Sequence, residues 1–600
     1  MQRNDHHPMK RAAAAAAIGA LAFAAAPLAA GAAEAPAPKN VIVMIGDGMG
    51  FNHVDHTSLF EHGTSNWQVD GDPGAEIARQ EGYGKTPAQV YERFDEALAM
   101  SHHSLNSPVY DPAGAWGEFD WAKHNPTDSA ASGTALATGE KTWNGKLGVD
   151  PDNQPKTNVA EAAAEKGRAT GVVSSVPFGH ATPAAWGAHV EHRQQYHDIA
   201  QQMIDGPLDV IIGAGHPLFD DDAQPREAKW KWLSEEQYAH LSEQDSGREF
   251  VEDSGRLTAI AGGETLPERL FGLVPIAETL QYNRSALADN EPRRDAGRPE
   301  GERLAEGSLL PGEAQKNDVP PLADLSSAAL NVLGQNDEGL FLMIEGGAID
   351  WAGHDNATAG NIEEMIDFNR AVERVTQWVE QNSSWEETLL LVTADHETGY
   401  LNGENSPKRW THVTGNAGEN PIDGWYSGDH TNHLVPLFAH GAGAETIRSY
   451  VKGVDPVRGE YVDNTDIAKI GFDLLANAKA PAPSEETTTT TTTEPVEETT
   501  GQVPPAEEPE PKEPPAEDGD RQPGDGEPHG DEPRGEIRES APGESAPAPG
   551  TTAPSGTAGG PRGGSLAATG ASVLGLVGLA GALVAAGAGA VALGKRRSRG

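Results

Sequence analysis

The sequence predicts an α/β fold with a mostly parallel central sheet flanked by helices. Between about residues 39 and 477, short apolar runs rich in β-branched residues alternate with longer amphipathic segments, and several runs end in an acidic residue or a histidine. Such alternation is typical of parallel sheets whose strands are joined by crossover helices. The runs expected to form strands are 41–45, 170–175, 210–212, 340–344, 388–393 and 435–439.

One helix is expected between residues 361 and 380, because apolar side chains recur there at helical spacing. By contrast, the stretch 220–320 is rich in Glu, Gly and Arg and shows no clear periodicity. We therefore expect an insertion or a surface crown at about 220–320. The apolar positions of the expected helix are Met365, Phe368, Val372, Val375 and Val379.

Residues 1–33 have the pattern of a secretory signal peptide. Lys10 and Arg11 precede an apolar run over 12–26, and small residues around 30–33 offer a cleavage site. We therefore expect a secreted protein whose catalytic domain spans 34–477. The sequence contains no cysteine, so any metal must be held by His, Asp, Glu or Thr side chains.

The C-terminal part changes composition twice. Residues 478–564 are rich in Thr, Pro and Glu, and we expect a disordered stalk there because so few apolar side chains are available for burial. Residues 565–600 resemble a bacterial cell-wall sorting signal: a pentapeptide at 566–570, an apolar stretch at 571–593 and a basic cluster at 595–599.

That resemblance implies cleavage by a sortase between Thr569 and Gly570 and attachment to the cell wall. Ala567 stands where the commonest form of the signal has proline. The alternative is a permanent membrane anchor, in which 571–593 is a transmembrane helix.

The formal net charge of −47 excludes a nucleic-acid partner, because such a surface repels polyanions. It also repels smaller anions unless bound cations reverse the local potential. Any site for an anionic ligand in this chain is therefore expected to contain metal ions.

Acidic residues and a histidine follow three of the expected strands. Asp47 comes after 41–45, Glu345 after 340–344, and Asp395 with His396 after 388–393. Ligands of open α/β sheets bind at the carboxyl ends of the strands, so these side chains are aimed at one crevice. Carboxylates gathered there need a cation, and this donor set suits zinc and magnesium.

Two further segments carry candidate functional residues. Asp350 and His354 are four residues apart and would chelate one ion from a single helix. Asp128 is a good N-cap, which places Ser129 at a helix N-terminus where an anion is favoured. Because no G-x-S-x-G motif is present, a metal rather than a His base is expected to ionise Ser129.

Six motifs together resemble the alkaline phosphatases, in that family's order and across nearly all of residues 40–470. The resemblance implies an enzyme of α/β fold that releases inorganic phosphate from phosphate monoesters through a phosphoserine on Ser129, and it allows a homodimer. The motifs are Gly-Asp-Gly-Met-Gly at 46–50, Thr-Asp-Ser-Ala-Ala-Ser at 127–132, Ala-Thr-Pro-Ala-Ala at 181–185, Glu345 with Asp350 and His354, Thr-Ala-Asp-His-Glu at 393–397, and His-Thr at 430–431.

The same resemblance implies two zinc ions, one magnesium ion and a phosphate-binding arginine, Arg193. Two metals and one Arg supply the positioning and charge neutralisation that phosphoryl transfer needs. The implied ligands are Asp350, His354 and His430 for the first zinc, Asp47, Asp395 and His396 for the second, and Asp47, Thr182 and Glu345 for magnesium.

Two positions depart from the best-known enterobacterial form of the family. His180 and Trp351 stand where that form has Asp and Lys, which leaves the identity of the third metal open. His53, His56 and His433 lie close in sequence to implied ligands, and we expect them behind the ligands or at the surface.

Three alternatives are weighed against a monoesterase. Sulfatases of the same superfamily commonly need a cysteine, which is absent. Phosphodiesterases of that superfamily mostly use a threonine nucleophile and lack the third metal site, whereas Thr182, Glu345 and Arg193 favour monoesters. A wall-anchored adhesin without catalytic activity fits the stalk but not the complete ligand set.

Overall fold

The computed structural model describes residues 37–75, 78–79, 86–243, 246–293, 301, 307–404 and 408–477 of the 600 in the chain. The expected signal peptide at 1–33, the stalk at 478–564 and the sorting signal at 565–600, with its apolar stretch at 571–593, lie outside these residues. Among the helices in the described part of the chain, none is both long enough and apolar enough to cross a membrane.

An eleven-stranded sheet forms the centre of the described structure. All neighbours from β10 to β7 run parallel, whereas β15 is antiparallel to β10 and β4, and β16 is antiparallel to β17. The expected α/β fold with a mostly parallel sheet is therefore confirmed. The strand order is β16 (Gly453–Asp455), β17 (Gly459–Asp463), β4 (Glu96–Ser101), β15 (Val435–Gly441), β10 (Thr388–Thr393), β1 (Asn40–Gly46), β9 (Leu340–Gly346), β5 (Ala169–Pro177), β6 (Val210–Ala214), β8 (Leu270–Leu273) and β7 (Glu249–Val251).

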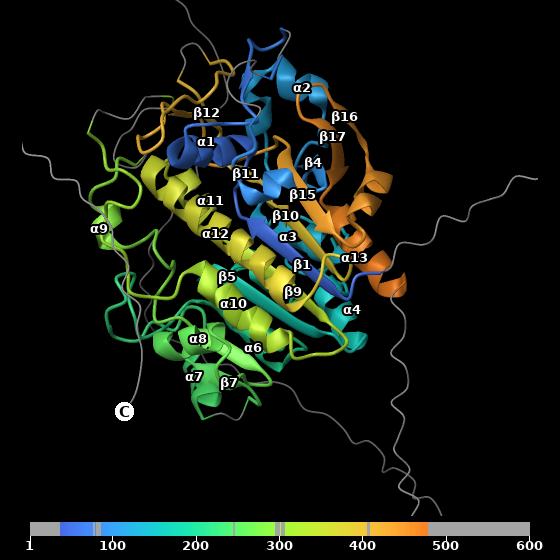
Figure 1. Cartoon of the computed structure of the whole chain (residues 1–600), viewed down its shortest axis with the longest axis vertical. Coiled ribbons are helices and arrows are strands. Elements are labelled where there is room, and N and C mark those ends of the chain that lie inside the picture. The colour runs from blue at the N-terminus through green and yellow to red at the C-terminus, as the bar shows by residue number, and fades with distance from the viewer. Residues whose placement is uncertain are drawn as a thin grey trace, which may run out of the picture. The chain divides into compact units, whose positions relative to one another are not determined.

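Helices cover the sheet in two groups. α10 (Leu322–Leu333) and α12 (Thr358–Asn382) contact each other and cross in front of the strands in Figure 1. α8 (Ser254–Ala261) packs on α10, and α1 (Phe51–His62) packs on α12. The second group consists of α3 (Ser129–Thr138), α4 (Val159–Glu165), α5 (Ala181–Ala184) and α13 (Thr465–Asn477), whose members pack together and against β5 and β9. Every residue of β1 and β9 is buried, as expected for strands covered on both faces.

The remaining elements are short and lie mostly between the strands and the larger helices. They are α2 (Pro112–Gly117), α6 (Tyr196–Asp205), α7 (Glu235–Ser242), α9 (Ser285–Ala288), α11 (Ala348–His354), the 3₁₀ helices η1 (Val90–Arg93), η2 (Phe119–Lys123) and η4 (Ala444–Tyr450), and the two-residue strands β2 (Val69–Asp70), β3 (Ala78–Arg79), β11 (Glu397–Thr398), β12 (Leu401–Asn402), β13 (Gly424–Trp425) and β14 (His430–Thr431).

The six expected strands are all present, as β1, β5, β6, β9, β10 and β15, and the expected helix 361–380 lies inside α12. Its apolar positions are fully buried, because α12 packs one face against α10, β1 and β9. The hydrophobic pattern alone therefore located the central layer of the fold.

The region 220–320 is partly built into the sheet. β7 and β8 extend the sheet beyond β6, and α8 packs on α10. After β8 the chain becomes irregular and packs against α11. Tyr282 and Leu287 share an apolar cluster there with Ala348 and Ala352. This second half of the region thus reaches the carboxyl ends of the strands, where the candidate site lies.

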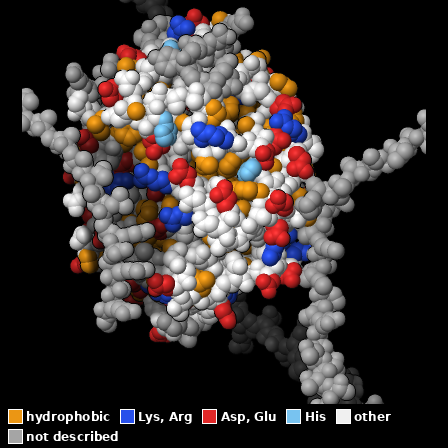
Figure 2. Space-filling view, viewed as in Figure 1, with side chains coloured by type: hydrophobic (Ala, Val, Ile, Leu, Met, Phe, Trp, Pro, Cys, Tyr) orange, Lys and Arg blue, Asp and Glu red, His pale blue; other side chains and the backbone are white. Residues whose placement is uncertain are grey.

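The face of the molecule in Figure 2 carries acidic and basic side chains interspersed among apolar and neutral ones. Acidic residues outnumber basic ones in the chain by 91 to 44. No single-sign patch dominates this face, so its charges favour solubility over binding of a polyanion.

Candidate active site

The candidate site lies at the carboxyl ends of four neighbouring strands. β10, β1, β9 and β5 are adjacent and parallel, and the register pairs Ile45 of β1 with both Thr393 and Glu345. Asp47 follows β1 by one residue and Asp395 follows β10 by two. The sheet therefore brings together side chains that are far apart in sequence: Asp47 and His396 are separated by 349 positions.

One donor cluster consists of Asp47, Asp395 and His396, all fully buried, with their ligand atoms within 4.8 Å of one another. His396 Nε2 lies 3.2 Å from Asp395 Oδ2 and 3.5 Å from Asp47 Oδ1. Gly48 turns the chain here with φ of +80°, and an added Cβ would meet Asp350 Cα at 2.8 Å. Only glycine therefore lets the loop after β1 approach helix α11 this closely.

A second cluster consists of Asp350, His354 and His430. Asp350 Oδ1 lies 3.3 Å from His354 Nε2 and 3.2 Å from His430 Nε2, and the two Nε2 atoms are 3.0 Å apart. Asp350 and His354 both belong to helix α11, as their spacing predicted. His430 comes from β14, which pairs with β11 directly after His396.

A third cluster contains Asp47, Glu345 and His180. Glu345 Oε2 accepts a hydrogen bond from the hydroxyl of Ser174, whereas its Oε1 is buried without a donor among the described residues. Thr182, in the short helix α5, is also fully buried. The structure thus adds His180 to the expected set of Asp47, Thr182 and Glu345.

The nitrogen Nε2 of each histidine in the first two clusters faces the neighbouring carboxylates. Nδ1 of His354 lies 2.9 Å from the carbonyl oxygen of Gly428, and Nδ1 of His430 lies 2.7 Å from that of Thr127. A carbonyl only accepts, so both Nδ1 atoms donate. Nε2 is then the ring nitrogen that a cation would bind, the arrangement typical of metal-bound histidines.

His396 is oriented by the hydroxyl of Thr398. That hydroxyl donates to Asp350 Oδ1 at 2.5 Å, so its single proton is already used, and it accepts from His396 Nδ1 at 3.2 Å. Thr398 therefore links the first two clusters. Sequence reasoning missed this role, although Thr398 follows Asp395 and His396 in the same segment.

The carboxylates are expensive to ionise together without a cation. Burial raises the pKa of Asp47 well above its usual value, and the neighbouring carboxylates Asp395, Asp350 and Glu345 add to the shift. Burial likewise raises the pKa of Glu345 to about 8 and that of Asp395 to about 6. Burial alone would raise the pKa of Asp350 too, but His354 and His430 outweigh it and lower that pKa well below its usual value.

One structural observation, independent of the sequence, indicates that these side chains suit metal ions. Both carboxylate oxygens of Asp47, Oε1 of Glu345 and Oδ2 of Asp395 are buried without a hydrogen-bond donor among the described residues. Unpaired buried carboxylate oxygens are costly, and a coordinated cation would satisfy all of them. We call these side chains together the donor floor: Asp47, Glu345, Asp350, His354, Asp395, His396 and His430.

Ser129 is the first residue of α3, capped by Asp128, whose Oδ1 accepts from Ala131 N at 3.0 Å. The Ser129 hydroxyl lies 3.2 Å from His396 Nε2. It therefore faces the donor floor, as predicted, and it lies at a helix N-terminus where backbone N–H groups favour an anion.

Arg193 lies beside Ser129 in the same pocket. Its Nη1 donates to Asp128 Oδ2 at 3.2 Å, and its Nη2 lies 3.1 Å from His180 Nε2. Burial lowers the pKa of His180 to about 3, and the positive charge of Arg193 adds to this shift. His180 is therefore neutral and can accept the Arg193 hydrogen bond.

The pocket over the donor floor has a volume of about 390 Å³. That volume falls within the usual range for small-molecule sites. Its described lining contains Ser129, His180, Arg193, Asp350, His354 and His430, together with Tyr282, Asn283, Trp351 and Asp355. Sequence reasoning missed Tyr282, Asn283 and Asp355, and also Asp429, whose carboxylate lies within 4.8 Å of the ligand atoms of His354 and His430.

The three neighbouring histidines are not part of the described lining of this pocket. His53 and His56 are fully buried, so the alternative of a surface position is wrong for both. His56 Nε2 contacts Asp423 at 3.1 Å, and His53 Nδ1 accepts from Gly50 N. His433 is partly buried and lies 3.2 Å from the Tyr400 hydroxyl, and burial lowers its pKa to about 3.

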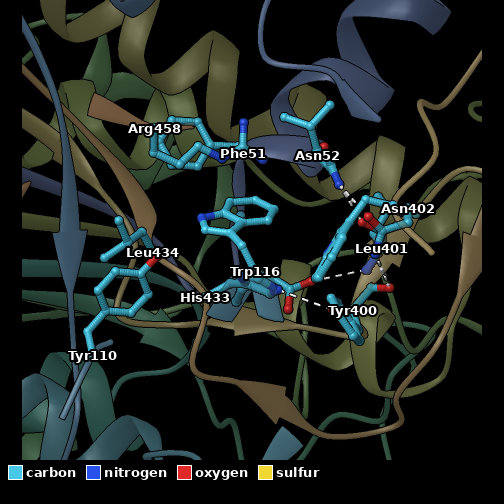
Figure 3. Close-up of a pocket in the computed structure, with 14 residues that line it drawn as sticks. Phe51, Asn52, Tyr110, Trp116, Tyr400, Leu401, Asn402, His433, Leu434 and Arg458 are labelled. Atoms are coloured by element: carbon cyan, nitrogen blue, oxygen red, sulfur yellow. Dashed lines mark hydrogen bonds between the residues drawn. The ribbon is translucent and has the colours of Figure 1, made fainter. Parts of the chain in front are cut away.

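A separate small cavity of about 30 Å³ is lined by His433 and by several aromatic side chains, among them Tyr110, Trp116 and Tyr400. Figure 3 shows Trp116 and His433 between Tyr110 and Tyr400 in this cavity. Space of this size holds only a few water molecules. The cavity is therefore too small for a substrate.

Comparison with known proteins shows which family this chain resembles. A family model described as alkaline phosphatase matches residues 38–420. Alkaline phosphatase 4 of Bacillus subtilis is 27% identical over 508 residues, covering 74% of this chain and 89% of the relative. Alkaline phosphatase of Escherichia coli K12 is 30% identical over 389 residues, covering 60% of this chain and 70% of the relative.

Among solved structures, a cold-active alkaline phosphatase from a psychrophilic Shewanella species aligns with a TM-score of 0.49 at 25% identity. The alignment covers 73% of this chain and 99% of that one. The family model spans most of the chain and includes five of the six predicted motifs, all but His-Thr at 430–431. This chain therefore belongs to the alkaline phosphatase family and is an alkaline phosphatase enzyme.

Proposed function

We propose that the protein hydrolyses phosphate monoesters through a phosphoserine on Ser129 and releases inorganic phosphate outside the cell. The observation that carries this proposal is that Ser129 Oγ lies 3.2 Å from His396 Nε2, in a pocket that also contains two histidines facing Asp350 and lies over buried carboxylate oxygens that lack donors. A hydroxyl beside such a set has both a means of activation and a place for a phosphoryl group.

The proposed ligand sets are those that the family resemblance implies, and, Thr182 aside, their side chains lie close together in the donor floor. Asp350, His354 and His430 would hold one zinc ion, and Asp47, Asp395 and His396 a second. A magnesium ion would be held by Asp47, Thr182 and Glu345, although the proximity of His180 favours a metal that accepts nitrogen as well. When bound, these ions would lower the pKa of the serine hydroxyl and of water and neutralise charge on the phosphoryl oxygens.

The side chains of the chain itself divide the remaining work. Ser129 Oγ attacks phosphorus, the bond to the alcohol oxygen breaks, and the phosphoserine is then hydrolysed by water to serine and inorganic phosphate. Arg193 binds two phosphate oxygens with its planar guanidinium group. Asp128 holds Arg193 at 3.2 Å and also caps the helix that begins at Ser129, so nucleophile and phosphate-binding group share one support.

Removal of metal tests this assignment. Treatment of the purified protein with a chelator should abolish hydrolysis of a monoester, and zinc with magnesium should restore it. The melting temperature should fall on chelation, because ions that bind only the folded state stabilise it. Full activity in excess chelator would contradict the metal-dependent mechanism.

A substrate panel separates the enzymatic alternatives. The purified protein should hydrolyse a phosphate monoester far faster than a phosphate diester or a sulfate ester. Preference for the diester would favour the phosphodiesterase alternative. The family match does not favour a non-catalytic adhesin.

We also propose that the protein is secreted by the signal peptide at 1–33 and attached to the cell wall through 566–570. Deletion of 566–600 should release active enzyme into the medium, and retention of that variant on the wall would contradict the sorting signal. The membrane-anchor alternative predicts that detergent, rather than wall digestion, extracts the full-length chain. A homodimer, which the family resemblance allows, is tested by light scattering of the purified protein.

A further inference from the structure

The pocket has a wall that the metal and phosphate assignments do not use. We call it the pocket wall: Tyr282, Asn283, Trp351 and Asp355. Trp351 and Asp355 flank His354 on and just after α11, whereas Tyr282 and Asn283 come from the irregular segment after β8. Any group esterified to a phosphate held at Ser129 and Arg193 must lie in the space that this wall bounds.

Contacts with α11 fix the wall in place. The Tyr282 hydroxyl donates to Asp355 Oδ2 at 2.7 Å, and Arg293 Nη1 contacts the same oxygen at 3.0 Å. The Arg293 guanidinium also lies over the Tyr282 ring, 4.4 Å from its centroid. An added Cβ on Gly360 would meet the Tyr282 ring at 2.6 Å, so the ring packs tightly against α12 as well.

A buried ion pair anchors the same segment from below. Arg284 Nη2 lies 2.7 Å from Glu363 Oε2 of α12, with the two side chains only 1% and 3% exposed. Arg284 also donates to the carbonyl oxygens of Gln281 and Gln315. The wall is therefore formed before substrate arrives and costs little ordering entropy on binding.

The polar groups of the wall are available to a ligand. Asn283 is partly buried, and its side-chain amide makes no hydrogen bond to any residue in the described part of the chain; only its backbone N–H is paired, with Thr279 Oγ1. Asp355 is 29% exposed, and its contacts with Tyr282 and Arg293 use Oδ2 alone. Arg293 offsets the negative charge of Asp355, which would otherwise repel a phosphate ester.

We propose that the pocket wall recognises the alcohol part of the substrate and favours phosphate monoesters of polyhydroxylated alcohols, such as a hexose 6-phosphate. This inference rests on the proposed monoesterase function. The Asn283 amide both donates and accepts, the free oxygen of Asp355 accepts, and hydroxyl groups supply the matching partners. Trp351, whose ring lies 5.8 Å from that of His180 between centroids, offers an apolar face for the C–H side of a sugar.

An aryl ester has fewer partners in this pocket. Tyr282 is only 1% exposed and its hydroxyl is already bonded, so Trp351 is the one aromatic side chain of the described lining, histidines aside, with an accessible face. A hydroxyl-free group would leave the Asn283 amide without a partner, which is unfavourable. The wall therefore selects by hydrogen bonding more than by apolar contact.

The test compares Asn283→Ala with the wild-type full-length chain. We measure kcat/KM for a hexose 6-phosphate and for p-nitrophenyl phosphate, and the inhibition constant of inorganic phosphate, which has no alcohol part. Loss of one neutral hydrogen bond should lower kcat/KM for the hexose ester about five- to tenfold. The aryl ester and inorganic phosphate should change by less than about twofold, since the phosphate contacts are intact.

Asn290→Ala is the matched control, because Asn290 belongs to the same segment but is exposed and donates only to Ala286 O. It should change none of the three constants. Equal losses for both esters in Asn283→Ala would overturn the proposal, as would no loss for the hexose ester. Asn283→Asp, which keeps the size of the side chain and removes its donor, repeats the test if the alanine variant folds poorly. If the wild-type chain hydrolyses neither ester, the proposed function itself fails.

Discussion

The donor floor and the pocket wall reach the same pocket by different structural routes. The floor is attached to the ends of adjacent parallel strands and to helix α11, so the sheet itself sets its spacing. The wall depends on an irregular segment held by individual contacts such as Arg284–Glu363 and Tyr282–Asp355. A sheet edge provides fixed positions for chemistry, whereas a packed loop lets the shape and polarity of the pocket vary.

Replacement of the nucleophile tests the floor most severely. Ser129→Ala should lower turnover by several orders of magnitude and abolish the phosphoenzyme, because no other hydroxyl is proposed to attack phosphorus. Acid quenching after exposure to labelled substrate measures the covalent intermediate. Ser132→Ala, one turn later in α3, should retain label, since Ser132 Oγ donates to Asp395 O and not to the pocket. Label retained by Ser129→Ala would identify another nucleophile.

Loss of the buried ion pair tests what holds the wall. Arg284→Ala should lower the free energy of unfolding by about 3–5 kcal/mol, because it leaves Glu363 buried without its counter-charge. Urea denaturation gives the value. Arg374→Ala is the control, since Arg374 is 43% exposed and pairs with Asp324 at the surface, where such pairs contribute about 0–1 kcal/mol. Equal losses in the two variants would show that the wall is not anchored at Arg284.

Arg193→Ala should keep the phosphoenzyme but weaken binding of substrate and inorganic phosphate by about 1.5–3 kcal/mol, the usual contribution of a hydrogen bond to a charged group. Steady-state kinetics with inorganic phosphate as inhibitor measures the change. Gln194→Ala, at the neighbouring exposed position, should behave as the wild type. A variant that loses the phosphoenzyme but binds phosphate normally would exclude this role for Arg193.

Tyr282→Phe sharpens the role of the wall with the smallest change. It removes one hydrogen bond to Asp355 and keeps the ring under Arg293. We expect a loss of about 1 kcal/mol in transition-state stabilisation for a hexose 6-phosphate and none for p-nitrophenyl phosphate. A loss shared by both esters would indicate that Tyr282 supports the floor instead.

The sequence predicted the sheet and the floor because both leave local signals. Apolar runs mark the buried strands, and Asp47, Glu345 and Asp395 follow them directly, so topology alone predicts that they meet. The resemblance to alkaline phosphatases added Arg193, Thr182 and His430, for which spacing gave no independent argument. The structure brings Arg193 and His430 into the pocket and buries Thr182 beside Glu345 in neighbouring elements.

The wall left no such signal. Tyr282 and Asn283 lie in a stretch without periodicity. Their position depends on two contacts with distant residues: Tyr282 bonds Asp355, 73 residues away, and Arg284 bonds Glu363, 79 residues away. A residue set by long-range packing is indistinguishable in sequence from an ordinary surface position. In the sequence, His180 was noted only as a departure from the best-known enterobacterial form of the family. Its place beside Asp47 and Glu345 depends on how β5 ends against β9.

The hydroxyl of Thr398 makes the two histidine-containing clusters a linked pair. It donates to Asp350 in one and accepts from His396 in the other. An event that draws electron density from Asp350 Oδ1 therefore also changes the strength of the bond to His396 Nδ1. Linkage of this kind is reciprocal: whatever factor occupation of one cluster applies to the affinity of the other, the second applies to the first. The two halves of the floor are thus expected to behave as coupled sites, with one threonine hydroxyl between them.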